Sequence, residues 1–278
     1  MLPFAKGRLE RPLAFFAKAN PMLKSFTLPD RFLVLDLEIV DDEILYAKYL
    51  KIDPRPAERR WPLRKTVAVS VMTLNIDGVC LEPTGFKSFS GPDEGRLLTE
   101  LFTFMREHGD HRLVTWGGCS ADVPILRSGA MANGLKLPPQ LIGNRRMRNG
   151  EHEHLDLAIA VKGAAGTYAH MSEVAVRCNT PVKMSGSTMA IPDLVRREEF
   201  RKLEWLAESD TISTALIMSC YLAANGNIAS ADAGQHAIIR FVRPLRSKAP
   251  YANYLGNVQQ RLREQMSREM QRWMAMDY

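Results

Sequence analysis

The first strong pattern in the chain is a nearly continuous apolar run over residues 31–40, RFLVLDLEIV. Such a run is typical of a strand that is buried on both faces in the middle of an α/β sheet. Residues 66–74 and the segment that ends at Phe89, separated by a turn at 75–78, continue in the manner of an antiparallel meander. Apolar residues then recur at helical spacing as far as Met105.

The later part of the chain changes from strands to helices. A short strand over residues 113–116 leads through two glycines into a helix that begins near Asp122, and residues 152–157 are predicted to form a fifth strand. The helical patterns beyond residue 158 cover residues 171–177, 191–208, 210–224, 231–242 and 251–276. This order predicts an α/β fold with one mixed five-stranded sheet flanked by helices.

The charge of the chain adds little by itself. The 278 residues include 37 Lys and Arg against 31 Asp and Glu, a net charge of +6, which permits a polyanionic partner without requiring one. The four cysteines form no CxxC pair, which argues against a zinc ribbon and favours a reducing compartment. No apolar stretch is long enough to span a bilayer, so we expect a cytoplasmic protein with no membrane partner.

Four acidic residues stand out by their positions. Asp36 and Glu38 alternate on the first strand, so both side chains project from one face and need a partner there, either a divalent cation or an arginine. Asp122 and Asp210 lie near the starts of predicted helices, where N-capping or an interaction with the helix dipole is the simpler explanation. Taken one at a time, these residues do not define a function.

Their order along the chain carries more information. Six segments that occur in sequence are Asp36-Leu-Glu38-Ile-Val40, residues 61–70, residues 115–126, His154-Leu-Asp-Leu157, residues 180–187 and residues 206–214. Together they resemble the motifs of the DEDD (DnaQ-like) superfamily of 3′→5′ exonucleases. The branch that they resemble most is the predicted one related to the proofreading domains of family B DNA polymerases. The likeness runs from about residue 31 to about residue 225.

The resemblance implies a ribonuclease-H-like fold and a two-metal phosphodiesterase. Asp36, Glu38, Asp122 and Asp210 would be the catalytic carboxylates and would hold two Mg²⁺ or Mn²⁺ ions, with Asp36 bridging them. Glu38 and Asp210 would favour the ion on the side of the attacking water, and Asp122 would act largely through the other ion. The expected reaction releases nucleoside 5′-monophosphates from single-stranded or frayed 3′ ends of DNA or RNA.

The sequence also departs from the family pattern. The family supplies a Tyr four residues, or a His five residues, before the last Asp, and this chain has Leu206 and Trp205 there. Neither can accept a proton, and Tyr221 is about three turns away on the same predicted helix. His170 is a loose substitute. The alternative function is therefore a catalytically degenerate protein that binds nucleic acid or serves as an assembly module.

Substrate contacts and a rival metal site follow from the remaining polar residues. Substrate-binding candidates are Trp116, Lys183, Arg145 and Arg146, with Trp61 as a second stacking face and Arg55, Arg59, Arg60 and Arg148 as further basic positions. The same basic residues could instead belong to solvated loops. His152, His154 and Asp156 alternate on one predicted strand and could bind zinc, although Asp156 is better explained as the cap of the next helix.

The two ends of the chain lie outside the likeness. We expect a basic N-terminal arm over residues 1–30, a domain over residues 31–225 and a helical extension over residues 226–278. The arm contains a single acidic residue before residue 30, so an amphipathic transit peptide is the alternative. The last helix carries an apolar stripe that would pack on the domain or on a second copy in a homo-oligomer.

Overall fold

The computed structural model describes residues 30–54, 61–142, 154–164, 166–186 and 190–276. Its strands are β1 (Arg31–Asp41), β2 (Arg64–Asp77), β3 (Cys80–Ser90), β4 (Arg112–Thr115) and β5 (His154–Asp156). The helices of the first half are α2 (Glu43–Ile52), the 3₁₀ turn η1 (Trp61–Leu63), α3 (Glu94–Glu107), α4 (Asp122–Ala132) and α5 (Pro139–Ile142). Those of the second half are α6 (Leu157–Lys162), α7 (Met171–Arg177), α8 (Ile191–Arg196), α9 (Phe200–Ala224), α10 (Ala231–Leu245) and α11 (Ala252–Met276).

The five strands form one mixed sheet in the order β3-β2-β1-β4-β5. β1 pairs antiparallel with β2 and parallel with β4. At the two edges of the sheet, β3 pairs antiparallel with β2, and β5 pairs parallel with β4. The long apolar run therefore forms the central strand, as its pattern predicts, because neighbouring strands and helices cover it on every side. The predicted ribonuclease-H-like sheet flanked by helices is confirmed.

The side chains of β1 divide between two cores. Leu33, Leu35 and Leu37 pack with α3, α4 and α5 on one face of the sheet. Phe32 and Val34 pack with α7, α9, α10 and α11 on the other face. Because side chains alternate along a strand, Asp36 and Glu38 share the face that carries α9.

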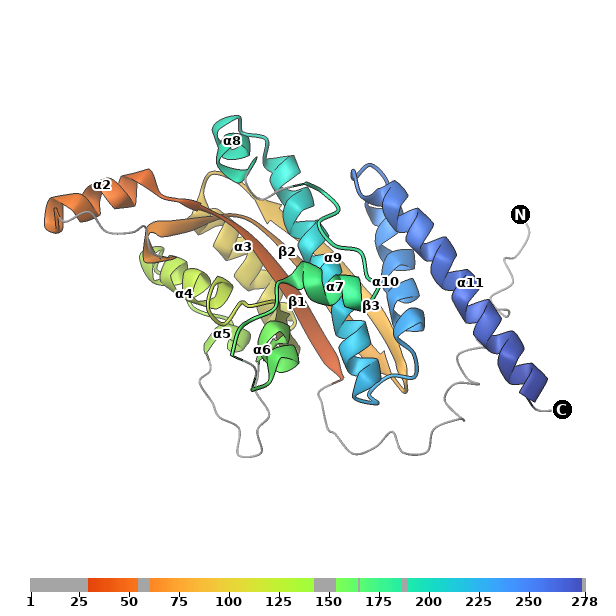
Figure 1. Ribbon diagram of the computed structural model, residues 1–278. Coiled ribbons are helices and arrows are strands. Elements are labelled where there is room, and N and C mark those ends of the chain that lie inside the picture. The colour runs from red at the N-terminus through yellow and green to blue at the C-terminus, as the bar shows by residue number, and fades with distance from the viewer. Residues whose placement is uncertain (1–29, 55–60, 143–153, 165, 187–189, 277–278) are drawn as a thin grey trace.

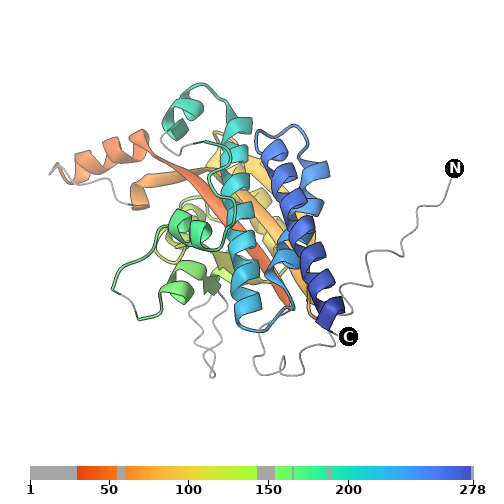
Figure 2. The ribbon, with the colours of Figure 1, turned by 45° about the vertical axis from the view of Figure 1, so that its right-hand side comes forward.

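The C-terminal helices form layers outside α9. Figure 1 shows α9 across the sheet with α10 and then α11 farther out, and in Figure 2 α11 comes forward over α10. On α11 the buried residues of the apolar stripe are Leu255, Val258 and Leu262, whereas Trp273 near the far end is 47% exposed. The first half of the stripe packs on this chain, and an oligomer through its second half stays a prediction.

Two details of the secondary structure differ from the sequence-based predictions. The pattern predicts one helix over residues 191–208 and another from residue 210, whereas the chain breaks between α8 and α9, where Glu198 adopts a φ of 56°. Asp210 therefore lies in the middle of a helix. In addition, the pattern does not predict α2, which extends away from the sheet in Figure 1 and contains no buried residue.

The close contact between α9 and α10 can be tested at Gly234. A Cβ atom on this glycine would lie 2.3 Å from the Ser219 Oγ, which donates a hydrogen bond to the Ala231 carbonyl. We expect Gly234→Ala to lower the free energy of unfolding by about 1–3 kcal/mol, because the hydroxyl must move and lose that bond. Chemical denaturation measures this change.

Gly256→Ala is the matched control. Its Cβ would meet only the flexible end of Arg243, at 3.1 Å, and alanine favours the helix. We expect this substitution to leave the stability unchanged or to raise it by up to about 1 kcal/mol. Equal losses in the two variants would contradict the proposed packing of α10 on α9.

Candidate active site

β1 carries two of the four predicted carboxylates, Asp36 and Glu38. Asp36 pairs in register with Ser70 of β2, and Glu38 pairs with Ala68. A bulge follows directly after Glu38, which is 3% exposed. Both acidic side chains lie on the α9 face of the sheet, from the middle of the central strand toward its C-terminal end. The prediction that they share a face is therefore confirmed by the strand register.

α9 carries the third carboxylate to the same place. Asp210 is flanked by Thr211, whose hydroxyl donates a hydrogen bond to the Ser70 carbonyl at 3.2 Å. Ser70 is the register partner of Asp36, so this contact fixes the turn of α9 that carries Asp210 beside the middle of β1. Because Asp210 lies within the helix, N-capping cannot explain its presence.

Asp122 is the first residue of α4, and the N-cap is Ala121, so the expectation that Asp122 caps this helix is wrong, whereas its place in the first turn agrees with an interaction with the helix dipole. It follows the loop of residues 116–121 that leaves β4. Gly118 in this loop lies beneath the Asp122 carboxylate, because a Cβ atom there would be 2.8 Å from Oδ2. The loop therefore depends on a residue with no side chain at this position.

A fifth acid holds that loop in place. The Asp156 carboxylate accepts hydrogen bonds from the backbone N–H groups of Gly117 and Cys119, both at 2.9 Å. It also caps α6 by accepting from the N–H groups of Ala158 and Ile159. The predicted capping role is confirmed, and the contact with the loop is an addition that the sequence does not reveal. The one indication in the sequence is the position of Asp156 between a predicted strand and a predicted helix, where a side chain can reach neighbouring loops.

The carboxylates influence one another strongly. Burial raises the pKa of Asp36 well above its ordinary value, and Asp210, Asp122 and Glu38 raise it further. Burial, followed by Asp210 and Asp122, raises the pKa of Glu38 to about 8. Burial and the nearby Asp156 raise the pKa of Asp122 to about 7. The structure thus brings the four predicted acids into one electrostatic cluster.

The donor chemistry of this cluster fits a hard divalent cation. All four groups offer carboxylate oxygens, which Mg²⁺ and Mn²⁺ prefer, and every influence on Asp36 disfavours its charged form in the absence of a cation. The side chains do not form a ready-made cage. Within the described residues, no three or more His, Cys, Asp or Glu groups stand in metal-binding geometry.

Lys183 and His170, which flank α7 in the chain, both lie near Asp210. Burial raises the pKa of Asp210, and Lys183 and His170 both act in the opposite direction. The Met184 N–H, directly after Lys183, donates a hydrogen bond to the Ser209 hydroxyl at 2.9 Å, directly before Asp210. Lys183 itself is exposed and adopts a left-handed backbone with φ 51°. Its position beside the cluster is therefore set by its neighbours.

The other substrate-binding candidates are distributed differently. Trp116 is partly buried against the core under α9, and Trp61 is 44% exposed. The basic candidates Arg55, Arg59, Arg60, Arg145, Arg146 and Arg148 lie outside the described residues. His152 lies outside them as well.

The described part of the alternative zinc site makes other contacts. The His154 ring nitrogens lie 2.8 Å from the Thr115 Oγ1 and 3.3 Å from the Cys119 Sγ. The Asp156 carboxylate is engaged by four backbone N–H groups of the loop and of α6. His154 and Asp156 therefore have structural partners that account for both of them.

The positions of the missing tyrosine or histidine are apolar in the structure. Leu206 is 6% exposed and packs with Val67, Ala68 and Leu203 at the end of the sheet. Trp205 is partly buried, with the Arg201 guanidinium 5.6 Å from its ring centroid. Neither side chain offers a proton acceptor to the carboxylate cluster.

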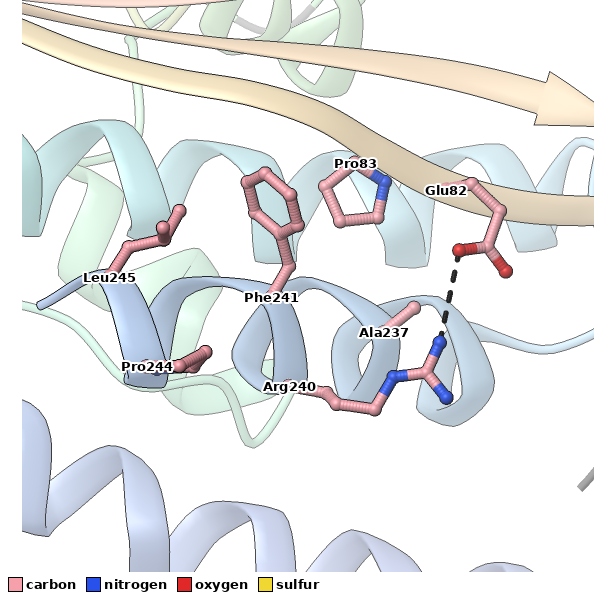
Figure 3. A pocket seen from close by; sticks show the side chains of 7 residues that line it. All are labelled: Glu82, Pro83, Ala237, Arg240, Phe241, Pro244 and Leu245. Carbon is pink, nitrogen blue, oxygen red and sulfur yellow. Dashed lines mark ion pairs between the residues drawn. The ribbon is translucent and has the colours of Figure 1, made fainter. Parts of the chain in front are cut away.

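A hollow of about 390 Å³ lies elsewhere, between β3 and α10. Figure 3 shows its lining, in which Phe241 lies beside Pro83 and Arg240 reaches Glu82 at 4.0 Å. None of the four carboxylates lines this hollow, so it is separate from the cluster.

The fold and the position of the acidic cluster are now established, and comparison with known proteins shows the family to which the chain belongs. Residues 59–257 match the family of predicted 3′–5′ exonucleases related to the exonuclease domain of PolB. The chain belongs to this family. The matched residues include Asp122 and Asp210, extend through α10, and begin after Asp36 and Glu38.

The chain was also compared with curated proteins and with solved structures. No curated protein matches the chain. Among solved structures, it is similar to the family B DNA polymerase of the hyperthermophilic archaeon Pyrobaculum calidifontis, with 17% identity and a TM-score of 0.46. The similarity covers 84% of this chain and 30% of the polymerase chain, so the chain spans less than a third of that polymerase. Within the described residues, no helix is long and apolar enough to cross a membrane.

The raised pKa values predict how stability depends on pH when a chelator removes divalent ions. The pKa of Glu38 rises from 4.5 to about 8 and that of Asp122 from 3.8 to about 7, so the folded chain retains protons that the unfolded chain releases. Their stabilising contribution is complete below the unfolded pKa values and is lost as the pH rises through about 7 to 8. Asp36→Asn removes one repelling charge and should therefore become more stabilising as the pH rises.

Thermal unfolding in chelator, followed by circular dichroism, measures this difference. At about pH 8.5 we expect the Tm of Asp36→Asn to exceed that of the wild type by about 2–4 °C, which corresponds to about 1 kcal/mol. Below about pH 4, where the carboxyls of the unfolded chain are protonated as well, the two values should converge. A Tm difference that stays constant with pH would show that the four acids do not repel one another in the folded chain.

Proposed function

We propose that this chain is a metal-dependent 3′→5′ exonuclease that releases nucleoside 5′-monophosphates from single-stranded or frayed ends of nucleic acid. The observation that carries the proposal is the convergence of Asp36, Glu38, Asp122 and Asp210 into one cluster of mutually repelling carboxyls. Membership of a family of predicted exonucleases supports the same reaction class. Such repulsion is unfavourable for folding, and a bound cation would relieve it.

In this proposal, two Mg²⁺ or Mn²⁺ ions would activate the attacking water and stabilise the leaving 3′-oxygen. The residues of the chain would hold these ions and orient the substrate. Asp36, at the centre of the cluster, would contribute to both ion positions, with Glu38, Asp122 and Asp210 completing the ligand set. Lys183 would attract the phosphate backbone toward the acidic cluster.

His170 does not replace the missing base in the geometry of the structure. It caps α7, and its Nδ1 accepts a hydrogen bond from the Ser172 N–H at 3.2 Å. A neutral imidazole that accepts at Nδ1 carries its proton on Nε2, so the free nitrogen is a donor and cannot take a proton from water. His170 is better suited to donate a hydrogen bond to a phosphate oxygen near Asp210.

The apolar Leu206 favours a second candidate function. If water is not oriented by a side chain, catalysis would rest on metal chemistry alone and would be slow. The limiting case is a degenerate member of the family that binds nucleic acid, or serves as an assembly module, without cutting it. The two functions share the carboxylate cluster and differ only in turnover.

A 5′-labelled oligonucleotide separates these functions. We expect purified protein with Mg²⁺ or Mn²⁺ to shorten it from the 3′ end, and Asp36→Asn to lower the rate about a thousandfold, because several kcal/mol of transition-state stabilisation are lost. Glu100→Gln, on the exposed surface of α3, is the control and should keep the wild-type rate.

Two results would count against the exonuclease. One is the absence of metal-dependent trimming by the wild type, and the other is trimming that survives in Asp36→Asn. DNA and RNA oligonucleotides in parallel would also determine the sugar preference. Binding of the oligonucleotide without trimming is the result expected of the degenerate alternative.

Lys183 gives a prediction about substrate binding alone. Lys183→Met should raise KM and reduce the slope of log affinity against log salt by about 0.7, the value for one phosphate contact on a single strand. Its kcat should stay close to that of the wild type. Lys87→Met, on β3 with its ammonium over the Phe104 ring, is the control. An unchanged KM and salt slope in Lys183→Met would remove Lys183 from the substrate path.

A further inference from the structure

A second acidic side chain of α9 is buried more completely than any member of the cluster. Glu208 is 0% exposed. Its Oε1 accepts hydrogen bonds from the Ser88 hydroxyl and from the Arg246 Nε, both at 2.7 Å, and its Oε2 accepts from the Tyr251 hydroxyl at 2.5 Å. A nitrogen of Arg201 lies 3.9 Å from Oε1. Each carboxylate oxygen is therefore satisfied, as a buried charge requires.

These partners come from distant parts of the chain. Ser88 belongs to β3, Arg246 directly follows α10, and Tyr251 directly precedes α11. Arg246 is itself held over the Phe86 ring, with its guanidinium carbon 4.9 Å from the ring centroid. Tyr251 is 0% exposed. The segment between the two C-terminal helices therefore reaches back to a single carboxylate in the middle of α9.

Glu208 lies two residues before Asp210 on the same helix. Successive residues are about 100° apart around a helix, so the two side chains leave opposite sides of one turn. Ser209 and Thr211, next to Asp210, are tethered to Met184 and Ser70, respectively. With the contacts of Glu208, three polar tethers surround this turn and determine in which direction Asp210 points.

We propose that Arg246 and Tyr251 are positioning residues for the active site: by holding Glu208 they fix the turn of α9 that presents Asp210 to Asp36. This inference rests on the proposed function. A well-packed apolar side chain would fill the same space without the desolvation penalty of a buried charge, which favours a role for the charged contacts in setting geometry. The helices beyond residue 225 are then a working part of the exonuclease domain.

Tyr251→Phe tests the proposal in the full-length chain, because it removes one hydrogen bond and keeps the ring. We expect about tenfold weaker Mn²⁺ binding, measured by calorimetry, and about tenfold lower kcat. KM for the oligonucleotide should not change, because no substrate contact is lost. Tyr254→Phe, on the exposed side of α11, is the matched control and should match the wild type in both measurements.

The measurements are made well below the Tm, so a loss of stability alone leaves both values unchanged. Wild-type protein that neither binds Mn²⁺ nor trims the oligonucleotide would overturn the proposed function itself. Wild-type protein that does both, beside a Tyr251→Phe variant with the same Mn²⁺ affinity and kcat, would overturn only the positioning role. If Tyr251→Phe does not fold, Arg246→Lys replaces it, since it keeps the charge and changes the donor geometry, and the same results decide.

Discussion

The carboxyl groups beside the C-terminal half of β1 repel one another, and this repulsion has to be overcome whenever the chain folds. Asp36 is surrounded by three other acids, and burial acts in the same direction as all of them. Such a cluster is unfavourable unless its charges are neutralised by protons or by a cation, so the surrounding fold must hold it against its own repulsion. The pKa values of about 7 and about 8 at Asp122 and Glu38 show that protons serve this purpose when no cation is bound.

The scaffold meets this demand with polar contacts made by residues that lie one to five positions from Asp122 or Asp210 along the chain. Thr211 attaches the Asp210 turn to the backbone beside Asp36, and Asp156 fixes the loop that leads to Asp122. Glu208 extends the same arrangement to the C-terminal helices. The carboxylates that would bind metal thus receive their positions from polar contacts made by other residues. Their own oxygens stay available for ligands, which is the arrangement that a metal-dependent nuclease needs.

Much of this architecture follows from local patterns, and the exceptions have physical causes. The apolar run of β1 and the alternation of Asp36 and Glu38 predict the central strand and its acidic face. The sequence pattern did not predict α2, because this helix buries no residue and therefore shows no apolar stripe. The Asp42 side chain caps its first turn. The predicted break at residue 209 was wrong: α9 runs through Ser209, whose hydroxyl accepts a hydrogen bond from the distant Met184 N–H and does not cap a new helix. For the same reason, no local pattern could indicate that Glu208 pairs with Arg246 and Tyr251.

Anomalous diffraction from crystals of the wild-type protein grown with Mn²⁺ would show directly whether the carboxylate cluster holds two ions. We expect two peaks about 3.5–4 Å apart, with Asp36 in contact with both. Glu38, Asp122 and Asp210 should complete the first coordination shell or hold its waters. Crystals grown in the same Mn²⁺ solution that show no peak beside these carboxylates, or that show peaks only at other residues, would contradict the two-metal proposal.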